Sequence, residues 1–132
     1  MASTTIVLWN REAVYESPAR KSFSVNWDGQ LSRADLSVDV DPNFLLLFGK
    51  PYLDKIVVNG TEIVFQGDRN DVVSADLRMV LRKGINLIEL YHNALPFWGI
   101  QTAGVYAYLV VESSFQFSLA RSALALCYPA SL

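Results

Sequence analysis

The chain has 132 residues, of which 52% are hydrophobic and 18% are charged. A chain of this length builds one hydrophobic core, and its composition is the opposite of the polar, highly charged composition of disordered proteins. We therefore predict a single folded domain over residues 1–132. Because the net charge is −2, the chain lacks the basic field that gathers phosphates, and nucleic acid is not an expected partner.

The single cysteine, Cys127, cannot form a disulfide within the chain, which is typical of proteins from a reducing compartment. The longest apolar run covers only 105–111, whereas a helix that spans a bilayer needs about 20 apolar residues. No membrane span is therefore expected. Residues 1–5 lack the basic and apolar regions of a secretory signal, so we expect no secretory signal and no export by that route.

Three strands are predicted in the first third of the chain, over 6–9, 23–27 and 34–40. In the second and third of these, apolar residues alternate with polar ones, which is the period of a strand with one solvated face. The turn signal Asp28-Gly29 lies between them.

Asn59 and Gly60 predict a β-hairpin, because both residues tolerate the positive φ that a two-residue type I′ turn requires. They also begin an Asn-Gly-Thr glycosylation acceptor, but the turn explains them without a glycan. The loop length fixes a register with these opposed pairs: Val58 and Thr61, Val57 and Glu62, and Ile56 and Ile63. On one face Lys55 lies diagonal to Glu62, which predicts a cross-strand pair of opposite charge. The other face carries the apolar residues expected in the core: Ile56, Val58, Ile63 and Phe65.

Further short strands are predicted over 44–48, 72–75, 86–91, 105–112 and 115–117. A short helical turn is predicted near 76–83, because Leu77, Val80 and Leu81 follow helical spacing and Gly84 stands where a C-terminal cap would be. Many short strands with Gly-rich turns between them are typical of all-β folds. We predict an antiparallel β-sandwich of jelly-roll type.

Two of the predicted strands, 44–48 and 105–111, are apolar on both faces, although a strand of a monomeric sandwich is expected to have one solvated face. The stretch 113–132 forms an apolar C-terminal extension of the same domain, with Arg121 as the only charged side chain after Ser118. It is predicted to dock on its own sandwich or on a neighbouring subunit. Its candidate interface residues are Leu119, Leu124, Leu126 and Tyr128.

The segments 33–38, 44–48, 56–60, 81–88 and 105–112 together resemble the galactose-binding-like β-sandwich family. In that family a hydrophobic strand runs into an Asn-Gly turn, and a later Leu-x-x-Gly-x-Asn precedes a core strand. The resemblance covers residues 33–112. It implies a jelly-roll module of the kind found beside the catalytic domains of many glycoside hydrolases, whose members bind sugars through loops at one end, serve as structural supports, or in some cases carry a calcium ion.

No catalytic residue is predicted. His92 is the only histidine and follows a predicted strand without a nucleophile motif nearby, so it is interpreted as a hydrogen-bonded strand-end residue. We expect that the protein is not an enzyme.

No metal or other cofactor is predicted. Asp39, Asp41 and Asn43 alternate along an extended segment and could offer oxygen ligands to calcium. However, Phe44 and Lys50 stand where a calcium loop needs glycine and glutamate. A second acidic loop departs from the calcium pattern in the same way: Asp68, Asn70 and Asp71.

The candidate ligand-binding residues are Tyr91, Phe97 and Trp98, which cluster between two predicted strands. Flat aromatic rings with a polar edge are what sugar-stacking sites use. The alternative is that Phe97 and Trp98 close one end of the sandwich or bind a partner chain. Trp9 and Trp27 are expected in the core.

The sequence thus favours a non-catalytic structural subunit of a larger assembly. A viral capsid or virion appendage is the expected assembly, located in the virion after assembly in the host cytoplasm, with copies of the chain or other structural subunits as partners. The alternative is a carbohydrate-binding module of galactose-binding-like type. A third hypothesis is an enzyme that uses His92.

Overall fold

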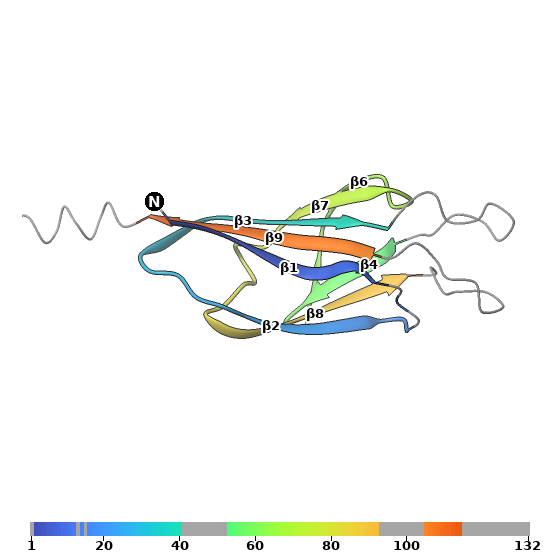
Figure 1. The fold of residues 1–132 in the computed structure, drawn as a ribbon, viewed down its shortest axis with the longest axis horizontal. Helices are drawn as coiled ribbons and strands as arrows, with labels where there is room; N and C mark the ends of the chain where they lie inside the picture. Colours follow the sequence, from blue (N-terminus) through green and yellow to red (C-terminus); the bar gives the residue numbers. More distant parts are fainter. Residues whose placement is uncertain (1, 13, 15, 41–52, 93–104, 115–132) are drawn as a thin grey trace, which may run out of the picture.

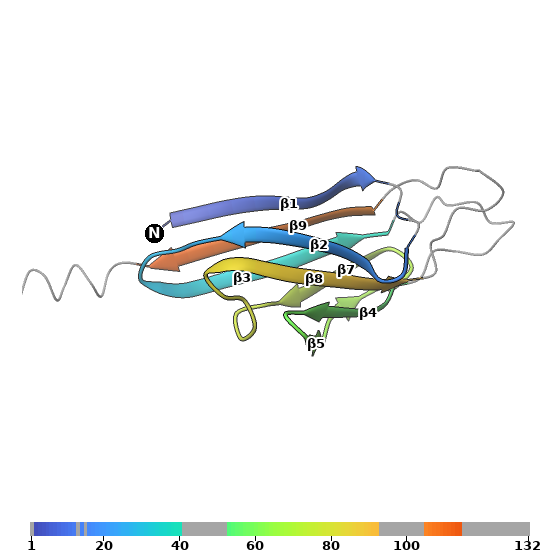
Figure 2. The same ribbon diagram turned by 90° about the horizontal axis from the view of Figure 1, so that it is seen from below.

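The computed structural model describes residues 2–12, 14, 16–40, 53–92 and 105–114. These residues form two antiparallel sheets that lie against each other, and no helix occurs among them (Figures 1 and 2). The prediction of an all-β antiparallel sandwich is confirmed.

Within the described residues, nine strands make up the two sheets, which we call sheet A and sheet B. Sheet A has, in spatial order, β1 (Ala2–Glu12), β9 (Val105–Ser114), β3 (Gln30–Asp39), β7 (Val72–Asp76) and β6 (Gln66–Gly67). Sheet B has β2 (Ala19–Val25), β8 (Gly84–His92), β4 (Leu53–Val58) and β5 (Thr61–Ile63).

The strands pair in a nested order. β1 pairs with β9, β2 with β8, β3 with β7, and β4 with β5, all antiparallel. Successive nested pairs fall alternately in sheet A and sheet B, while the two-residue strand β6 is added at the outer edge of β7. The described chain therefore resembles one long hairpin that has been folded over itself.

Most predicted strands lie within observed ones, but their ends differ. β1 is longer than the predicted 6–9, and the strand predicted over 23–27 covers Ala19–Val25 and ends before Trp27. The strands predicted over 44–48 and 115–117 lie outside the described residues.

The hairpin has the predicted register, with the three opposed pairs expected from its two-residue loop. Asn59 and Gly60 have φ values of 50° and 84°. The register places Lys55 diagonal to Glu62 as predicted, and the Lys55 ammonium lies over the ring of Tyr91, 4.6 Å from the centroid. Tyr91 is directly opposite Lys55 on the neighbouring strand β8 and offers the nearer partner.

The predicted helical segment over 76–83 is a single hydrogen-bonded turn. The carbonyl oxygen of Leu77 accepts bonds from the N–H groups of Val80 (3.1 Å) and Leu81 (2.9 Å). The N–H of Leu77 donates to the carbonyl of Ala34 in β3, which ties the segment to sheet A. Gly84 has φ 94° as predicted, and β8 begins there.

The core lies between the sheets. On β9 every second side chain is buried, and the intervening ones are half-buried on the outer face of sheet A. The second apolar face expected for 105–111 is therefore this outer face. Trp9 is in the core as predicted, whereas Trp27 is half-buried and packs against it.

Candidate functional site

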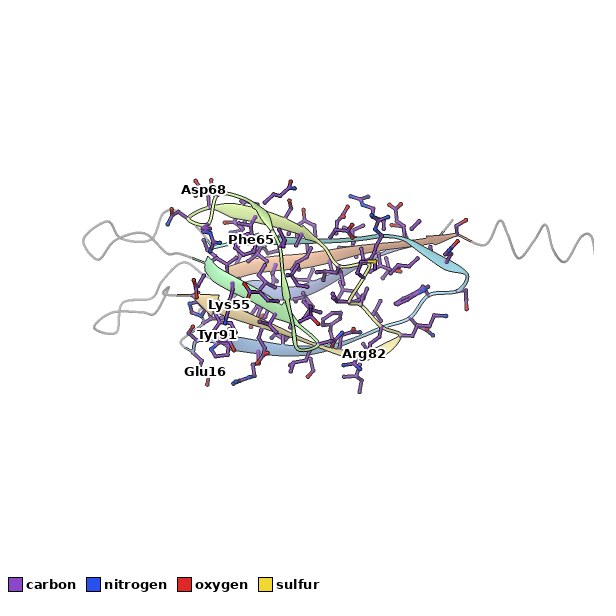
Figure 3. All side chains as sticks on the ribbon, turned by 180° about the vertical axis from the view of Figure 1, so that it is seen from behind. Glu16, Lys55, Phe65, Asp68, Arg82 and Tyr91 are labelled. Atoms are coloured by element: carbon purple, nitrogen blue, oxygen red, sulfur yellow. The ribbon has the colours of Figure 1, made fainter. Side chains whose placement is uncertain are left out.

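Of the predicted ligand-binding residues, Tyr91 lies on the outer face of sheet B, and Phe97 and Trp98 lie outside the described residues. Tyr91, Lys55 and Glu16 are near the same end of the sandwich (Figure 3). Because the Lys55 ammonium covers one face of the Tyr91 ring, a sugar stacking there would have to use the other face or displace it.

His92 is buried, with 8% of its surface exposed. Its backbone N–H donates to Oγ of Ser17 (3.0 Å), and Nε2 lies 2.6 Å from the carbonyl oxygen of Glu16. A carbonyl only accepts, so Nε2 carries the proton and donates it. Burial lowers the pKa of His92, and the bond to Glu16 opposes this in part. These contacts hold residues 16–17 against the end of β8.

The acidic loop at 68–71 is held by turn hydrogen bonds. Oδ1 of Asp68 accepts from the N–H of Asn70 (2.9 Å). The backbone carbonyl oxygen of Asp68 accepts from the N–H of Asp71 (2.9 Å). Arg69 donates to the carbonyl oxygens of Leu53 and Asp54, which attaches the loop to β4. Across the part of the chain that the structure describes, no three His, Cys, Asp or Glu side chains form a group that could hold a metal ion. Asp41 and Asn43 of the other acidic segment are not among those residues.

The predicted interface residues lie outside the described residues: Leu119, Leu124, Leu126 and Tyr128. Residues 113 and 114, the first two of the predicted extension, still belong to β9.

A groove of about 810 Å³ lies along sheet A. Side chains of β3, β7 and β9 line it, and β5 with the segment that follows it and the turn that follows β7 complete its wall. Its volume is within the range of ligand-binding clefts, roughly 300–1,000 Å³. No motif or residue pattern in the sequence indicates this groove.

Two rows of side chains cross the groove wall. In the first row, Tyr108 of β9 is opposite Ser37 of β3, which is opposite Ser74 of β7. The next row is Val110, Asp35 and Asp76. All six line the groove. Tyr106, 5.6 Å from Tyr108 between ring centroids, lies on the same outer face but does not line the groove.

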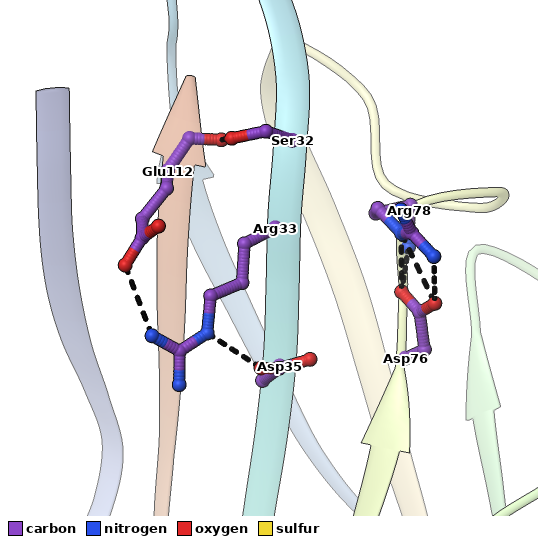
Figure 4. Close-up of polar contacts among 6 residues, drawn as sticks. All are labelled: Ser32, Arg33, Asp35, Asp76, Arg78 and Glu112. Carbon is purple, nitrogen blue, oxygen red and sulfur yellow. Dashed lines mark hydrogen bonds and ion pairs between the residues drawn. The ribbon is translucent and has the colours of Figure 1, made fainter. Parts of the chain in front are cut away.

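Two sets of charged side chains beside the groove are paired (Figure 4). Arg33 bonds Asp35 at 2.6 Å and Glu112 at 2.9 Å, which joins β3 to β9. Arg78 bonds Asp76 at 2.8 Å. Hydrogen bonds from the side chain and the backbone N–H of Arg78 lower the pKa of Asp76, so this carboxylate stays ionised at neutral pH.

The outer face of sheet B carries exposed apolar side chains. Ile85 is 73% exposed and Leu87 is 36% exposed, both on β8. On β2, Ser24 is opposite Ile85 and Ser22 is opposite Leu87. We call these four residues the sheet B patch: it has one bulky row beside one row of small side chains.

No family model, curated protein or solved structure matches the chain. None of the described residues belongs to a helix that could cross a bilayer.

Proposed function

We propose that the protein is a non-catalytic structural subunit that assembles with further copies of itself. The sheet B patch is the observation that carries this proposal. Ile85 and Leu87 lie next to each other on the outer face of β8, near its start, and expose large apolar side chains whose contact with water is unfavourable and would be removed by a partner.

The arrangement of the patch favours a second copy as the partner. A two-fold axis parallel to the sheet face, along the strand direction and between the two copies, would bring the bulky row of one copy over the small row of the other. Ile85 and Leu87 would then fill the space above Ser24 and Ser22. Such a self-complementary surface is what an isologous contact requires.

The nested strand pairing supports a jelly-roll form of the sandwich, in which the two sheets are built from alternately placed hairpin pairs. Jelly rolls serve as viral capsid domains and as lectins. The exposed sheet B patch favours the first of these, so we propose a capsid or virion appendage protein whose working location is the virion.

Light scattering at increasing protein concentration tests the assembly. We expect wild-type particles larger than the monomer, and smaller particles for Ile85→Asp, because a buried unpaired carboxylate is costly at an interface. The matched control is Val64→Asp, which adds the same charge at an apolar residue that is 88% exposed and lies outside both sheets. A wild-type protein that remains monomeric at millimolar concentration would contradict the proposal.

Electron microscopy of the concentrated protein tests the virion assignment. Regular closed or tubular particles are expected. Amorphous aggregates would contradict a capsid role, even if light scattering showed self-association.

A carbohydrate-binding module of galactose-binding-like type is the second candidate, and the groove is the observation that favours it. Tyr108 offers a ring for stacking, while Ser37, Ser74 and Asp35 offer hydroxyl and carboxylate groups for hydrogen bonds to a sugar. Phe97 and Trp98 remain part of this proposal.

Titration calorimetry with galactose-containing oligosaccharides tests the second candidate. Tyr108→Ala is expected to abolish binding at the groove, whereas Tyr106→Ala, on the same strand and face, is expected to keep it. If only Tyr91→Ala reduces binding, the sugar site is at the end of sheet B instead. If no variant changes the heat of binding, the carbohydrate proposal fails.

A further inference from the structure

The edges of the two sheets differ in how they are protected. A strand edge exposes unpaired N–H and C=O groups, and proteins limit pairing there with short strands, bulges and charged side chains. Among the described strands, four lie at sheet edges: β1 and β6 in sheet A, and β2 and β5 in sheet B. β6 and β5 have only two and three residues, and β2 carries the adjacent cations Arg20 and Lys21.

The fourth edge strand, β1, is protected along only half of its length. Its second half has register shifts between Val7 and Trp9 and between Asn10 and Glu12, and Arg11 has φ 54°. Such bulges bend a strand out of the plane in which a further strand could pair. Charges are also confined to this half.

The first half of β1, residues 2–7, has none of these protections. Its pairing with β9 is regular, and it has no charged side chain and no proline. It is rich in β-branched residues, which favour strand pairing. No described strand pairs with its other side, which forms the free edge of sheet A (Figure 2).

We propose that residues 3–7 of β1 pair antiparallel with the same residues of a second copy, about a two-fold axis at Thr5, so that two copies of sheet A become one continuous sheet. This inference goes beyond the proposed function, because it rests on a sheet edge and not on the sheet B patch.

The sequence of this segment suits that register. With the axis at Thr5, Thr5 is opposite its own copy, Thr4 is opposite Ile6, and Ser3 is opposite Val7. The two side chains of each pair lie on the same face of the sheet, because the two residue numbers are both odd or both even. No like charges meet, and a Thr–Thr pair stands at the centre, where it can form a cross-strand hydrogen bond.

Charge exchange at Thr5 tests the proposal by light scattering. Thr5 is exposed, so a charged side chain is compatible with the folded monomer, which thermal unfolding verifies. The measurements are made in the Ile85→Asp background, in which the sheet B patch no longer contributes. There we expect a dimer, which Thr5→Lys converts to a monomer because two ammonium groups would face each other across the axis.

Rescue makes the test specific. An equimolar mixture of the Thr5→Lys and Thr5→Glu chains should restore the dimer, since opposite charges then face each other. Asn10→Lys is the matched control, because it adds the same charge to the same face of β1 beyond the first bulge, and it should leave the dimer intact.

The outcomes separate the two proposals. If Ile85→Asp alone gives monomers, the edge contact is overturned and the sheet B contact stands. If Ile85→Asp leaves the wild-type assembly unchanged, the sheet B contact is overturned, and the edge contact is then decided by Thr5→Lys in the wild-type chain. The edge contact is overturned if the Thr5→Lys protein remains a dimer. It is also overturned if the mixture of the Thr5→Lys and Thr5→Glu chains remains monomeric.

Discussion

At the scale of single residues, the side chain of Asn86 joins three segments although only 1% of it is exposed. Its Oδ1 accepts from the N–H of Arg82 (2.9 Å) and from Nδ2 of Asn59 (2.8 Å). Its Nδ2 donates to the carbonyl oxygens of Arg82 (2.8 Å) and Gly84 (3.1 Å). The hairpin turn and the turn before β8 are therefore held by one amide.

We expect Asn86→Ala to lower the free energy of unfolding by about 2–4 kcal/mol, because it removes four part-buried hydrogen bonds. Urea unfolding measures this loss. Gln30→Ala, which truncates an exposed amide, serves as the control and should change the free energy of unfolding by less than about 0.5 kcal/mol. Equal effects of the two variants would show that the Asn86 bonds do not stabilise the fold.

The lowered pKa of His92 predicts a pH dependence. Burial favours the neutral ring, so below the unfolded pKa of about 6.5 the unfolded chain binds more protons than the folded one. The contribution of His92 to the free energy of unfolding is therefore fully present above that pH, and it is lost as the pH drops toward the pKa of the folded state. Urea unfolding between about pH 7.5 and pH 5 should show this fall, and His92→Gln should remove it. If the free energy of unfolding of the wild-type protein and of His92→Gln changed with pH in parallel, the pH dependence would not arise from His92.

At the scale of elements, β6 depends on one glycine. Gly67 has φ 114°, and a Cβ at this position would overlap the carbonyl oxygen of Val72. A side chain here would push β6 away from β7, because the obstructing atom belongs to the backbone of the paired strand.

Gly67→Ala is therefore expected to destabilise the protein more than Gly60→Ala. Gly60 also has a positive φ, 84°, but nothing lies within 4 Å of the added Cβ, so its cost is the backbone strain alone, about 1–2 kcal/mol. The overlap at Gly67 should add at least about 1 kcal/mol. Hydrogen exchange of the β7 amides should accelerate only in Gly67→Ala. Similar unfolding and exchange for both variants would contradict this role of Gly67.

The elements that are predictable from sequence are those with local causes. The hairpin register follows from Asn59 and Gly60 alone, since the loop length determines which residues face each other. β6 is not predictable, because its two residues pair only where the chain passes β7. The turn at Leu77 shows helical spacing, but it does not continue, because the N–H of Arg82 donates to Oδ1 of Asn86 instead.

At the scale of the whole molecule, the groove and the sheet B patch depend on strand order, which pattern alone does not determine. Tyr108, Ser37 and Ser74 come from three strands that neighbour each other only in the folded sheet. In β8, moreover, polar Asn86 points inward while Ile85 and Leu87 point outward. Residue polarity therefore does not show which face of this strand meets the core.

Both proposed contacts predict that thermal stability depends on protein concentration. A partner that binds only the folded chain raises Tm by mass action. For the wild-type protein we expect Tm to rise by about 5 °C over a hundred-fold increase in concentration. The combined variant Ile85→Asp with Thr5→Lys should have a constant Tm, whereas Val64→Asp with Asn10→Lys, which adds the same charges away from both contacts, should keep the rise. A wild-type Tm that is constant over this range would show that neither surface is buried by a second copy. Association of folded chains shifts the folding equilibrium by mass action, so Tm would otherwise rise with protein concentration.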